Sequence, residues 1–243
     1  MNIFTKFIDL IYPPRCHICR TFLDYANNGS RHFCIECLNS FSLVAPPVCS
    51  ICGIPFGSKT QDDHLCERCL RKSPFYDLLR APYLYKGTLM EVILQIKYSR
   101  KNYLADSLAP VFACFAEELF RNMEDLLLIP VPLHPQKLRE RGFNQSLLLA
   151  RGIEKKLNAE LDFLSLRRVK YTGTQTGLNI DERRKNVRGA FDLVKGVQFK
   201  DRNVLLVDDV ATTGSTMNEC ARVLKKAGCS RVYGLVLART AAL

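Results

Sequence analysis

The residues with the clearest capacity for chemistry are two adjacent carboxylates, Asp208 and Asp209, in the string LLVDDVATTGST over Leu205–Thr216. They follow a continuous apolar strand predicted over Asn203–Val207. A strand that ends there delivers both carboxylates to the carboxyl-terminal edge of a sheet, where open α/β folds bind ligands. Paired carboxylates at such an edge can accept short, charge-assisted hydrogen bonds from the vicinal diol of a sugar.

A run of hydroxyl residues follows the carboxylates directly. We expect the binding loop to comprise Ala211, Thr212, Thr213, Gly214, Ser215 and Thr216. Gly214 lets the backbone curl closely, and the loop, with the N-terminus of the helix after it, can hold a dianionic phosphate. Two carboxylates beside a phosphate repel it unless a diol or Mg²⁺ lies between them, so both halves together indicate a sugar phosphate. The alternative is that the Asp pair ends a strand and the hydroxyl residues cap a helix.

Eight of the eleven cysteines form four Cys-x-x-Cys pairs, which are Cys16 and Cys19, Cys34 and Cys37, Cys49 and Cys52, and Cys66 and Cys69. The two-residue gap lets both sulfurs of a pair reach one tetrahedral ion, which predicts one or two structural zinc sites. Sequential pairing would give a double zinc ribbon, and interleaved pairing would give a cross-brace. We favour the sequential pairing because Pro46 and Pro47 separate two self-contained units.

The remaining cysteines and the nearby histidines are assigned no ligand role. His17, His32 and His64 are superfluous as zinc ligands and are expected to be polar neighbours or solvent-facing. Three cysteines fit apolar helix or strand-edge positions and are expected to be buried packing residues, namely Cys114, Cys220 and Cys229.

The string Leu205–Thr216 resembles the phosphoribosyl-pyrophosphate (PRPP) loop of type I phosphoribosyltransferases. It differs from PRPP synthases because Thr212 and Thr213 directly precede the glycine. Together with the Cys pairs, two further segments resemble the ComF family. They are IPVPLHPQKLRERGFNQS (Ile129–Ser146) and TGTQTGL with the basic run after it (Thr172–Arg188). That resemblance implies a zinc-ribbon region, a type I phosphoribosyltransferase domain and a link to DNA uptake in natural competence.

The resemblance also implies roles for individual residues. The turn of Pro132, Leu133 and His134 would bind pyrophosphate, and Arg139, Arg141, Asn144 and Gln145 would bind phosphate oxygens or orient substrate. Arg141 would join Asp208 and Asp209 as a catalytic residue, and Mg²⁺ would bind with PRPP, mainly through ligand oxygens and water. The alternative is that the arginines are solvated and that Asn144 caps a helix.

A flexible hood over the site is implied for the segment after residue 171. Its members would be Thr172, Gln175, Arg183, Arg184 and Asn186. A basic loop that closes over PRPP would exclude water and stabilise the departing pyrophosphate. The alternative is a solvated basic face.

The elements that must position these residues follow from hydrophobic periodicity. We expect strands over Leu79–Tyr85, Leu126–Val131, Asn203–Val207 and Arg231–Ala238, and helices over residues 2–11, Leu89–Tyr98, Tyr103–Met123 (interrupted near Pro110), Asn144–Leu157 and about Met217 to Gly228. Residues 164–190 are expected to form a mobile loop or excursion. Strand, helix and strand in succession form a βαβ unit, which predicts an α/β fold with a parallel sheet flanked by helices. The expected domains are a cysteine-rich double zinc ribbon with its N-terminal helix over residues 1–74 and a phosphoribosyltransferase-like domain over residues 75–243.

Charge and hydropathy bound the class of protein. The formal net charge is +11, and residues 79–243 hold 27 Lys and Arg against 17 Asp and Glu, so the later domain is the basic one and favours anionic ligands. No apolar run approaches the roughly 20 residues of a membrane-spanning helix, and the N-terminus lacks the features of a signal peptide. We therefore expect a cytoplasmic protein without membrane insertion.

Two functions remain open from the sequence. The first is an enzyme that transfers phosphoribosyl from PRPP to an unidentified acceptor with release of pyrophosphate. The second is a binding protein that handles single-stranded DNA, or contacts a protein of the competence machinery, and holds PRPP or a 5-phosphate without consuming it. The loop supports both, because holding a ligand differs from turning it over.

Overall fold

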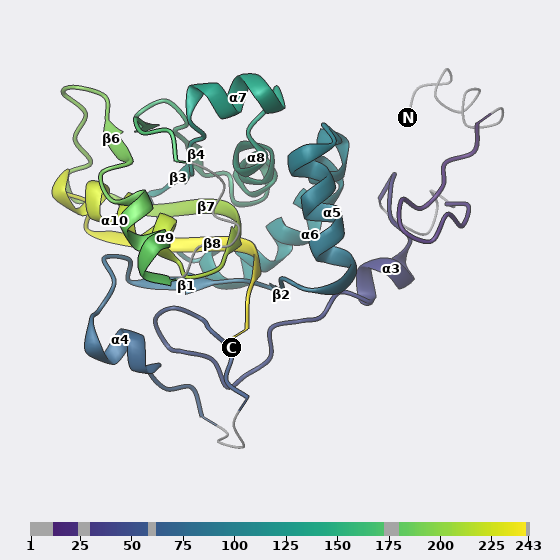
Figure 1. Cartoon of the computed structure of the whole chain (residues 1–243), viewed down its shortest axis with the longest axis horizontal. Helices are drawn as coiled ribbons and strands as arrows, with labels where there is room; N and C mark the ends of the chain where they lie inside the picture. The colour runs from purple at the N-terminus through teal and green to yellow at the C-terminus, as the bar shows by residue number, and fades with distance from the viewer. Residues whose placement is uncertain (1–11, 24–29, 58–61, 173–179, 242–243) are drawn as a thin grey trace.

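A parallel β-sheet forms the centre of the protein in the computed structural model, which describes residues 12–23, 30–57, 62–172 and 180–241 (Figure 1). Its strand order is β1-β8-β7-β3-β4, and β2 also pairs with β8. The strands are β1 (Leu78–Arg80), β2 (Tyr83–Leu84), β3 (Leu126–Pro130), β4 (Glu160–Leu161), β7 (Asn203–Ala211) and β8 (Arg231–Arg239). The predicted α/β class with a parallel sheet is confirmed.

The central strands have apolar middles because helices or loops cover both faces of the sheet. Every residue of β3 is buried. In β7 the four residues from Val204 to Val207 have no exposed surface. Their parallel register joins Leu128 of β3 to Leu205 of β7, and Leu205 to Tyr233 of β8.

Helices α5 (Gly87–Tyr98), α6 (Asn102–Phe120) and α8 (Gln145–Leu157) contribute to the core on one face of the sheet. Helices α6 and α8 approach each other closely at Gly152, where an added Cβ atom would lie 2.9 Å from the Cβ of Ala109. This spacing matters for the site because α8 begins at the carboxyl-terminal edge of the sheet.

Helix α10 (Ser215–Lys226) covers the other face. An antiparallel hairpin of β5 (Leu166–Arg168) and β6 (Phe191–Leu193) packs beside it, and α9 (Ile180–Val187) lies between these two strands in the chain. The predicted excursion over residues 164–190 therefore contains regular structure among its described residues, which corrects the expectation of a loop. Few of its side chains are apolar, so hydrophobic periodicity gave no signal.

Two further strand predictions need correction. Strand β7 continues past Val207 to Ala211, because its pairing with β8 continues through Asp208 opposite Val236 and Ala211 opposite Arg239. The predicted strand over Leu79–Tyr85 is divided into β1 and β2. Pro82 lies between the two and has no N–H group to donate to a sheet.

The helices also differ from the predictions at two places. Helix α6 runs unbroken through Pro110, which lies on its exposed side, where water can satisfy the carbonyl group that Pro110 leaves unbonded. The short helix α7 (Pro135–Arg141) was not predicted, and it begins with a proline at its first position. The helix expected over residues 2–11 lies outside the described residues. Cys114 of α6 is exposed rather than buried, whereas Cys220 and Cys229 are buried as expected.

Candidate functional site

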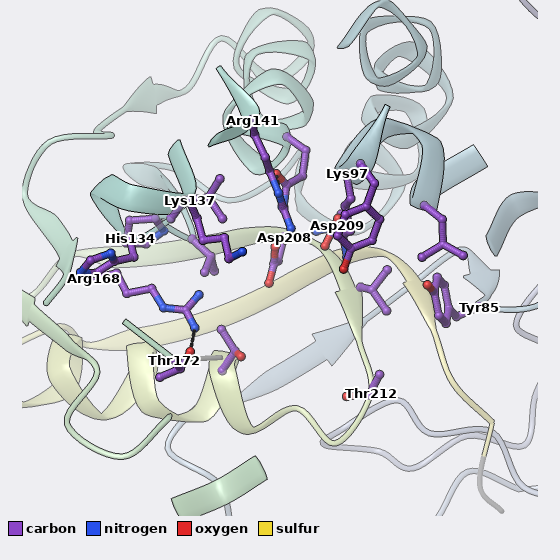
Figure 2. A pocket seen from close by; sticks show the side chains of 18 residues that line it. Tyr85, Lys97, His134, Lys137, Arg141, Arg168, Thr172, Asp208, Asp209 and Thr212 are labelled. Atoms are coloured by element: carbon purple, nitrogen blue, oxygen red, sulfur yellow. Dashed lines mark hydrogen bonds and ion pairs between the residues drawn. The ribbon is translucent and has the colours of Figure 1, made fainter. Parts of the chain in front are cut away.

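A pocket of about 390 Å³ opens at the carboxyl-terminal ends of β3 and β7 (Figure 2). Its walls come from the turn after β3 and from α5, α7, β5 and the loop between β7 and α10. Asp208 and Asp209 lie near its centre. Ligand sites of α/β proteins commonly occupy this edge of the sheet, where loops from several strands meet.

Asp208 is buried at the base of the pocket. The Ser146 hydroxyl of α8 donates to Asp208 Oδ1 at 2.7 Å, and the backbone N–H of Asp209 donates to the same oxygen at 2.9 Å. Burial, reinforced by the neighbouring Asp209 carboxylate, raises the pKa of Asp208 to about 7. The Asp208 side chain can therefore gain or lose a proton close to neutral pH.

Asp209 is held by a cation that the sequence analysis did not identify. Lys97 Nζ of α5 lies 2.9 Å from Asp209 Oδ2, and both side chains are largely buried. Burial by itself lowers the pKa of Lys97, but the Asp209 carboxylate outweighs burial and raises it. A lysine near the end of a largely apolar helix was the available signal, and only the fold brings it to Asp209.

The hydroxyl loop divides between two cavities. Thr212 and Thr216 line the main pocket, whereas Thr213, Gly214 and Ser215 line a separate cavity of about 60 Å³. The Thr213 and Ser215 hydroxyls are 2.7 Å apart. Gly214 has a φ of +73°, which favours glycine, and an added Cβ would lie 3.1 Å from the Tyr76 hydroxyl oxygen. Ala211 also differs from the prediction, because its side chain is buried in the core rather than lining the pocket.

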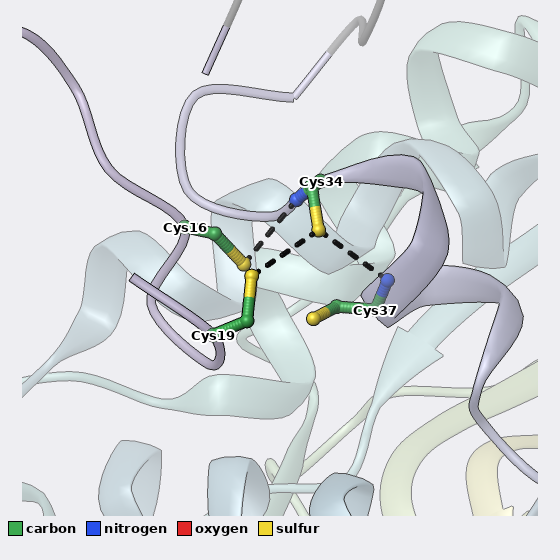
Figure 3. A group of neighbouring side chains, drawn as sticks. All are labelled: Cys16, Cys19, Cys34 and Cys37. Atoms are coloured by element: carbon green, nitrogen blue, oxygen red, sulfur yellow. Dashed lines mark hydrogen bonds between the residues drawn. The ribbon is translucent and has the colours of Figure 1, made fainter. Parts of the chain in front are cut away.

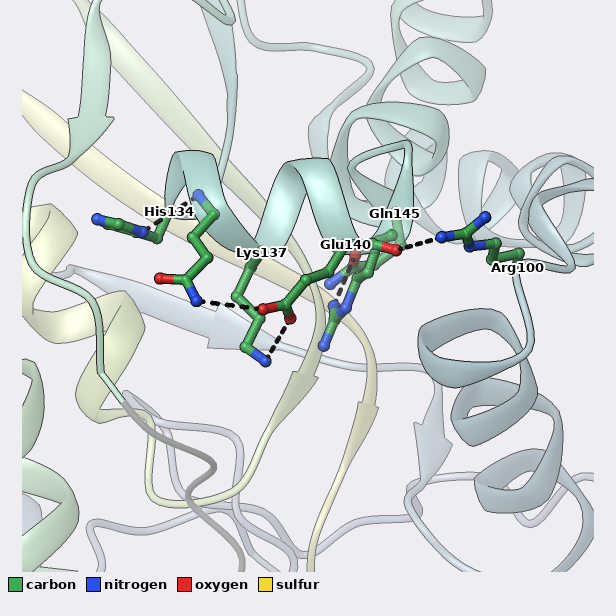
Figure 4. A network of polar contacts seen from close by, with 7 residues as sticks. Arg100, His134, Lys137, Glu140 and Gln145 are labelled. Carbon is green, nitrogen blue, oxygen red and sulfur yellow. Dashed lines mark hydrogen bonds and ion pairs between the residues drawn. The ribbon is translucent and has the colours of Figure 1, made fainter.

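The turn after β3 and helix α7 line one wall of the pocket. The residues of the turn that do so are Val131, Pro132, Leu133 and His134. His134 Nδ1 accepts a hydrogen bond from the backbone N–H of Gln136 at 3.3 Å, which caps α7 (Figure 4). Two cations of α7, Lys137 and Arg141, extend into the pocket. Lys137 was not predicted.

Hydrogen bonds orient the α7 cations. Lys137 Nζ donates to Glu140 Oε2 at 2.7 Å, and Arg141 Nη1 donates to Gln145 Oε1 at 3.2 Å. The Lys137 contact with Glu140 raises the pKa of the lysine. Arg139, in contrast, is exposed on α7 and does not line the pocket.

Asn144 supports the pocket without lining it. Its Oδ1 accepts from the Ser146 N–H at 3.0 Å and so caps α8, and its Nδ2 donates to the Val131 carbonyl at 3.1 Å. The capping alternative therefore describes what Asn144 does in this structure. Because the same cap fixes Ser146, Asn144 also sets the position of the hydroxyl that holds Asp208.

A third wall comes from β5 and the residues after it. Arg168 extends into the pocket, with its guanidinium 5.4 Å from the centre of the Phe191 ring, and Nη2 donates to the Thr172 hydroxyl. Burial lowers the pKa of Arg168, and its buried Nε has no hydrogen-bond partner among the residues that the structure describes. Arg168 was not predicted, because the segment carries no motif that distinguishes this arginine from its neighbour Arg167.

Of the expected hood residues whose side chains the structure describes, Thr172 lines the pocket. Asn186 lies on α9 and does not line the pocket. Gln175 and the side chains of Arg183 and Arg184 lie outside the described residues.

The end of the pocket beyond Asp209 is more apolar and was not predicted. Tyr85, which follows β2, lies there, and Leu94 and Tyr98 of α5 also line the pocket, with the Tyr98 ring centre 5.7 Å from the Arg141 guanidinium. In Figure 2, His134, Lys137 and Arg168 lie on one side of Asp208, and Tyr85 lies beyond Asp209 on the other.

The eight paired cysteines form two clusters. Cys16, Cys19, Cys34 and Cys37 make the first, and Cys49, Cys52, Cys66 and Cys69 make the second. In each cluster the four sulfur atoms lie within 4.8 Å of one another (Figure 3 shows the first). The clusters join consecutive Cys pairs, which confirms the sequential pairing and excludes the interleaved one.

The geometry of both clusters fits zinc. The sulfurs of Cys19 and Cys34 are 3.6 Å apart, and those of Cys52 and Cys66 are 3.7 Å apart. A tetrahedral ion with bonds of about 2.3 Å to sulfur has sulfur–sulfur edges of roughly 3.8 Å. At the start of α3 (Ile35–Asn39), the backbone N–H of Cys34 approaches the sulfur of Cys16 at 3.4 Å. At the start of α4 (Glu67–Arg71), the backbone N–H of Cys66 approaches the sulfur of Cys49 at 3.4 Å.

The two clusters attach differently to the rest of the protein. Near the first, His17 bonds Gln95 of α5 at 2.7 Å, and His32 bonds Ser107 of α6 at 2.8 Å, so both histidines are polar neighbours rather than ligands. The second cluster is part of the core beneath α10, and three of its cysteines pack there beside Tyr76.

Two features fasten the second cluster to β1. Leu79 N–H donates to the Ile51 carbonyl at 2.8 Å. The guanidinium of Arg80 donates to the carbonyls of Cys49, Ser50 and Ile51. An added Cβ at Gly53 would lie 2.3 Å from the Leu79 carbonyl oxygen, so only glycine permits this approach.

Comparisons with known proteins agree with both halves of the chain. Residues 7–70 match the model of the double zinc ribbon domain, and residues 144–242 match that of the phosphoribosyl transferase domain. Competence protein F of Haemophilus influenzae is 34% identical over 229 residues, which cover 93% of this chain and 96% of that protein. The chain belongs to the ComF family.

Other relatives extend the comparison. DNA utilization protein YhgH of Escherichia coli K12 is 32% identical over 95% of this chain and 99% of its own length. A solved hypoxanthine phosphoribosyltransferase of Staphylococcus aureus aligns over 58% of this chain and 64% of that chain, with 12% identity and a TM-score of 0.35. This ComF protein thus combines a double zinc ribbon with a phosphoribosyltransferase domain. Among its described residues, none of the helices has the length and apolar character needed to cross a membrane.

Proposed function

We propose that the pocket binds PRPP. The ribose diol bonds to the carboxylates of Asp208 and Asp209, and the 5-phosphate binds the loop from Thr212 to Thr216. The pyrophosphate binds the turn of residues 131–134 together with Arg141 and Lys137. This division follows from charge, because each phosphate lies against N–H groups, hydroxyls or cations, and the diol lies against the hydrogen-bond acceptors.

One observation carries the proposal. Both carboxylates line a single pocket together with Thr212, Thr216 and cations that project from α7 and β5. Carboxylates alone would favour a cation, and cations alone would favour any anion. Their juxtaposition selects a ligand that has hydroxyl donors in the middle and phosphates beside them, as an activated ribose phosphate has.

The donor set is compatible with Mg²⁺, which prefers oxygen ligands and usually retains several waters. Asp208 and Asp209 supply carboxylate oxygens next to the diol site, and Lys97 already neutralises one of them. Such an ion would neutralise charge on the pyrophosphate and bind mainly through ligand oxygens and water.

We further propose that the protein transfers phosphoribosyl to an acceptor. Arg141 and Lys137 stabilise the negative charge that develops on departing pyrophosphate, because both are aimed at that position before reaction. The carboxylates hold the ribose in a fixed orientation, which lowers the entropic cost of reaching the transition state. Asp208, Asp209 and Arg141 are the proposed catalytic residues.

Calorimetric titration of PRPP with Mg²⁺ tests this proposal. We expect Asp208→Asn and Asp209→Asn each to weaken binding by about tenfold to a hundredfold, because a hydrogen bond to a charged group contributes roughly 1.5–3 kcal/mol. The matched control is Asp106→Asn, at an exposed position of α6, and this variant should bind PRPP as the unaltered protein does. Undiminished PRPP affinity in both pocket variants would reject the site.

Relatives of this protein are named for competence and DNA utilization, and we propose a role in DNA uptake for this protein as well. Its proposed partners are PRPP and either single-stranded DNA or a competence protein. We place the protein in the cytoplasm and the boundary between its two domains between residues 74 and 75. Pyrophosphate release separates an enzyme from a non-catalytic binder. Absence of release with every acceptor, together with salt-sensitive binding of single-stranded DNA, would favour the binder.

A further inference from the structure

Helix α10 carries a buried carboxylate that lies outside the pocket. Glu219 follows Ser215, the first residue of the helix, by about one turn, and its side chain is buried without lining the pocket. An ionised carboxylate is costly to bury unless charged or hydrogen-bonding groups compensate it. The partners of Glu219 therefore indicate which parts of the protein it joins.

Two donors satisfy the Glu219 carboxylate. The Arg222 guanidinium bonds both oxygens, from Nη2 to Oε1 at 2.7 Å and from Nε to Oε2 at 3.0 Å. The backbone N–H of Gly189 also donates to Oε1, at 2.7 Å. Burial by itself raises the pKa of Glu219, but Arg222 and the Gly189 N–H outweigh burial and lower it. Glu219 is therefore a carboxylate at neutral pH, and its bond to Gly189 is charge-assisted.

Gly189 lies at the base of the excursion that separates β5 from β6. It has a φ of +63°, which favours glycine, and the next residue, Ala190, accepts a hydrogen bond at 2.8 Å from the N–H of Val169. Because Val169 directly follows β5, the chain enters and leaves the excursion at one place. Arg222 belongs to α10 itself, so the Gly189 bond is what connects Glu219 to the excursion, whose helix α9 lies against α10 (Figure 1).

Residues next to this base reach the pocket. Arg168 is the last residue of β5 and pairs with Phe191 of β6, two positions after Gly189. The Arg168 guanidinium donates to the Thr172 hydroxyl, and both residues line the pocket. Because the two strands are paired, a shift of Gly189 would carry Phe191 and Arg168 with it. The position of Arg168 in the pocket thus depends on where Gly189 is held.

We infer that Glu219 is a positioning residue that ties the base of the excursion to α10 and thereby aligns Arg168 with the hydroxyl loop. The inference rests on the proposed PRPP site, in which the 5-phosphate binds the loop from Thr212 to Thr216. Helix α10 begins in that loop, so a segment fastened to α10 keeps its place relative to the phosphate. Glu219 acts through Arg168 and does not contact the ligand itself.

Calorimetry with ribose 5-phosphate and with pyrophosphate tests this role. We expect Glu219→Ala to weaken ribose 5-phosphate by about tenfold, the order of one charge-assisted hydrogen bond, and to leave pyrophosphate within about twofold. Glu219→Gln should retain most of the affinity, because its amide oxygen can still accept from Gly189. The matched control is Glu160→Ala, which removes a carboxylate bonded to Arg202 at the amino-terminal edge of the sheet and should change neither affinity.

A double-mutant cycle separates positioning from a purely structural role. If Glu219 acts through Arg168, Glu219→Ala should add less than about twofold to the loss of ribose 5-phosphate affinity in Arg168→Met. Additive losses would show that the two residues act separately. Equal losses for ribose 5-phosphate and pyrophosphate in Glu219→Ala would show general damage to the pocket. Either result overturns the inference.

Gly189→Ala serves as the second variant if Glu219→Ala does not fold. Alanine disfavours the left-handed φ of this position, so the base of the excursion should move away from Glu219 and ribose 5-phosphate should bind more weakly. Unchanged affinity in Glu219→Ala, or in Gly189→Ala where it replaces that variant, overturns the inference and leaves the PRPP site standing. If the unaltered protein binds neither PRPP nor ribose 5-phosphate, the proposed function fails and the inference fails with it.

Discussion

At the scale of single residues, Arg168 distinguishes the two phosphate positions of the proposed ligand. Its guanidinium bonds Thr172 and lies 5.4 Å from the centre of the Phe191 ring, which shares a core with residues of α10, the helix that begins at the hydroxyl loop. Arg141 approaches the carboxylates from α7 instead. We therefore expect Arg168 to bind the 5-phosphate and Arg141 to bind the pyrophosphate.

Three ligands test this assignment by calorimetry. Arg168→Met should weaken ribose 5-phosphate about tenfold to a hundredfold, because a charge-assisted hydrogen bond contributes roughly 1.5–3 kcal/mol, and should leave pyrophosphate within about twofold. Arg141→Met should show the opposite pattern. PRPP should lose affinity in both variants. A loss of pyrophosphate affinity in Arg168→Met, with ribose 5-phosphate unaffected, would reverse the assignment.

At the scale of elements, the distance between α6 and α8 sets the floor of the pocket. Gly152 of α8 faces Ala109 of α6, and α8 carries the Ser146 hydroxyl that bonds Asp208. A larger side chain at residue 152 must push the helices apart. It would meet the Cβ atom and the carbonyl group of Ala109, and neither can move unless the backbone of α6 moves.

We expect Gly152→Val to lower the free energy of unfolding by about 1–3 kcal/mol, the usual cost of overpacking a core. Urea denaturation measures the change. Arg151→Val places the same side chain at the neighbouring exposed position of α8 and controls for the helix propensity of valine. Equal stabilities of the two variants would show that α6 and α8 tolerate separation.

At the scale of the whole molecule, the two cysteine clusters contribute unequally to the site. The second cluster shares a core with Tyr76, whose hydroxyl faces Gly214 of the binding loop, and Phe75 N–H donates to Asn218 of α10 at 2.7 Å. The first cluster bonds α5 and α6 through two histidines. Metal binding to such clusters contributes directly to folding.

Paired serine variants compare the clusters. Cys16→Ser with Cys19→Ser, and Cys49→Ser with Cys52→Ser, should each lower the zinc content from two ions per chain to one. We expect the second variant to lose PRPP binding and to melt at a lower temperature, because the loop loses its support. The first should retain PRPP binding to within a fewfold. Equal PRPP affinities in the two variants would contradict unequal support.

Charge at this scale also follows the site. The later domain carries the excess of basic residues, and Lys97, Lys137, Arg141 and Arg168 gather in one pocket. Net charge alone predicted an anionic ligand. It could not say which cations lie together, because composition has no spatial content.

The sequence by itself determined what depends on neighbours along the chain. The strand, the Asp pair, the hydroxyl loop and the helix after it are consecutive, so the composition of this segment predicts its structure. The gap within each Cys pair likewise allows two sulfurs to reach one ion. The sequence also predicted the parallel sheet and helix α8, offered Asn144 as the cap of that helix, and resembled the ComF family.

Only the tertiary structure decided what depends on contacts between distant segments. Lys97 reaches Asp209 across 112 positions of the chain, and Arg168 enters the pocket from a hairpin with little apolar pattern. Strand β7 extends to Ala211 because β8 continues to supply hydrogen-bond partners, and the Cys pairs join in sequence because each half folds on itself. Local spacing determines which groups a segment can offer, whereas packing of the sheet and helices determines which of those groups meet.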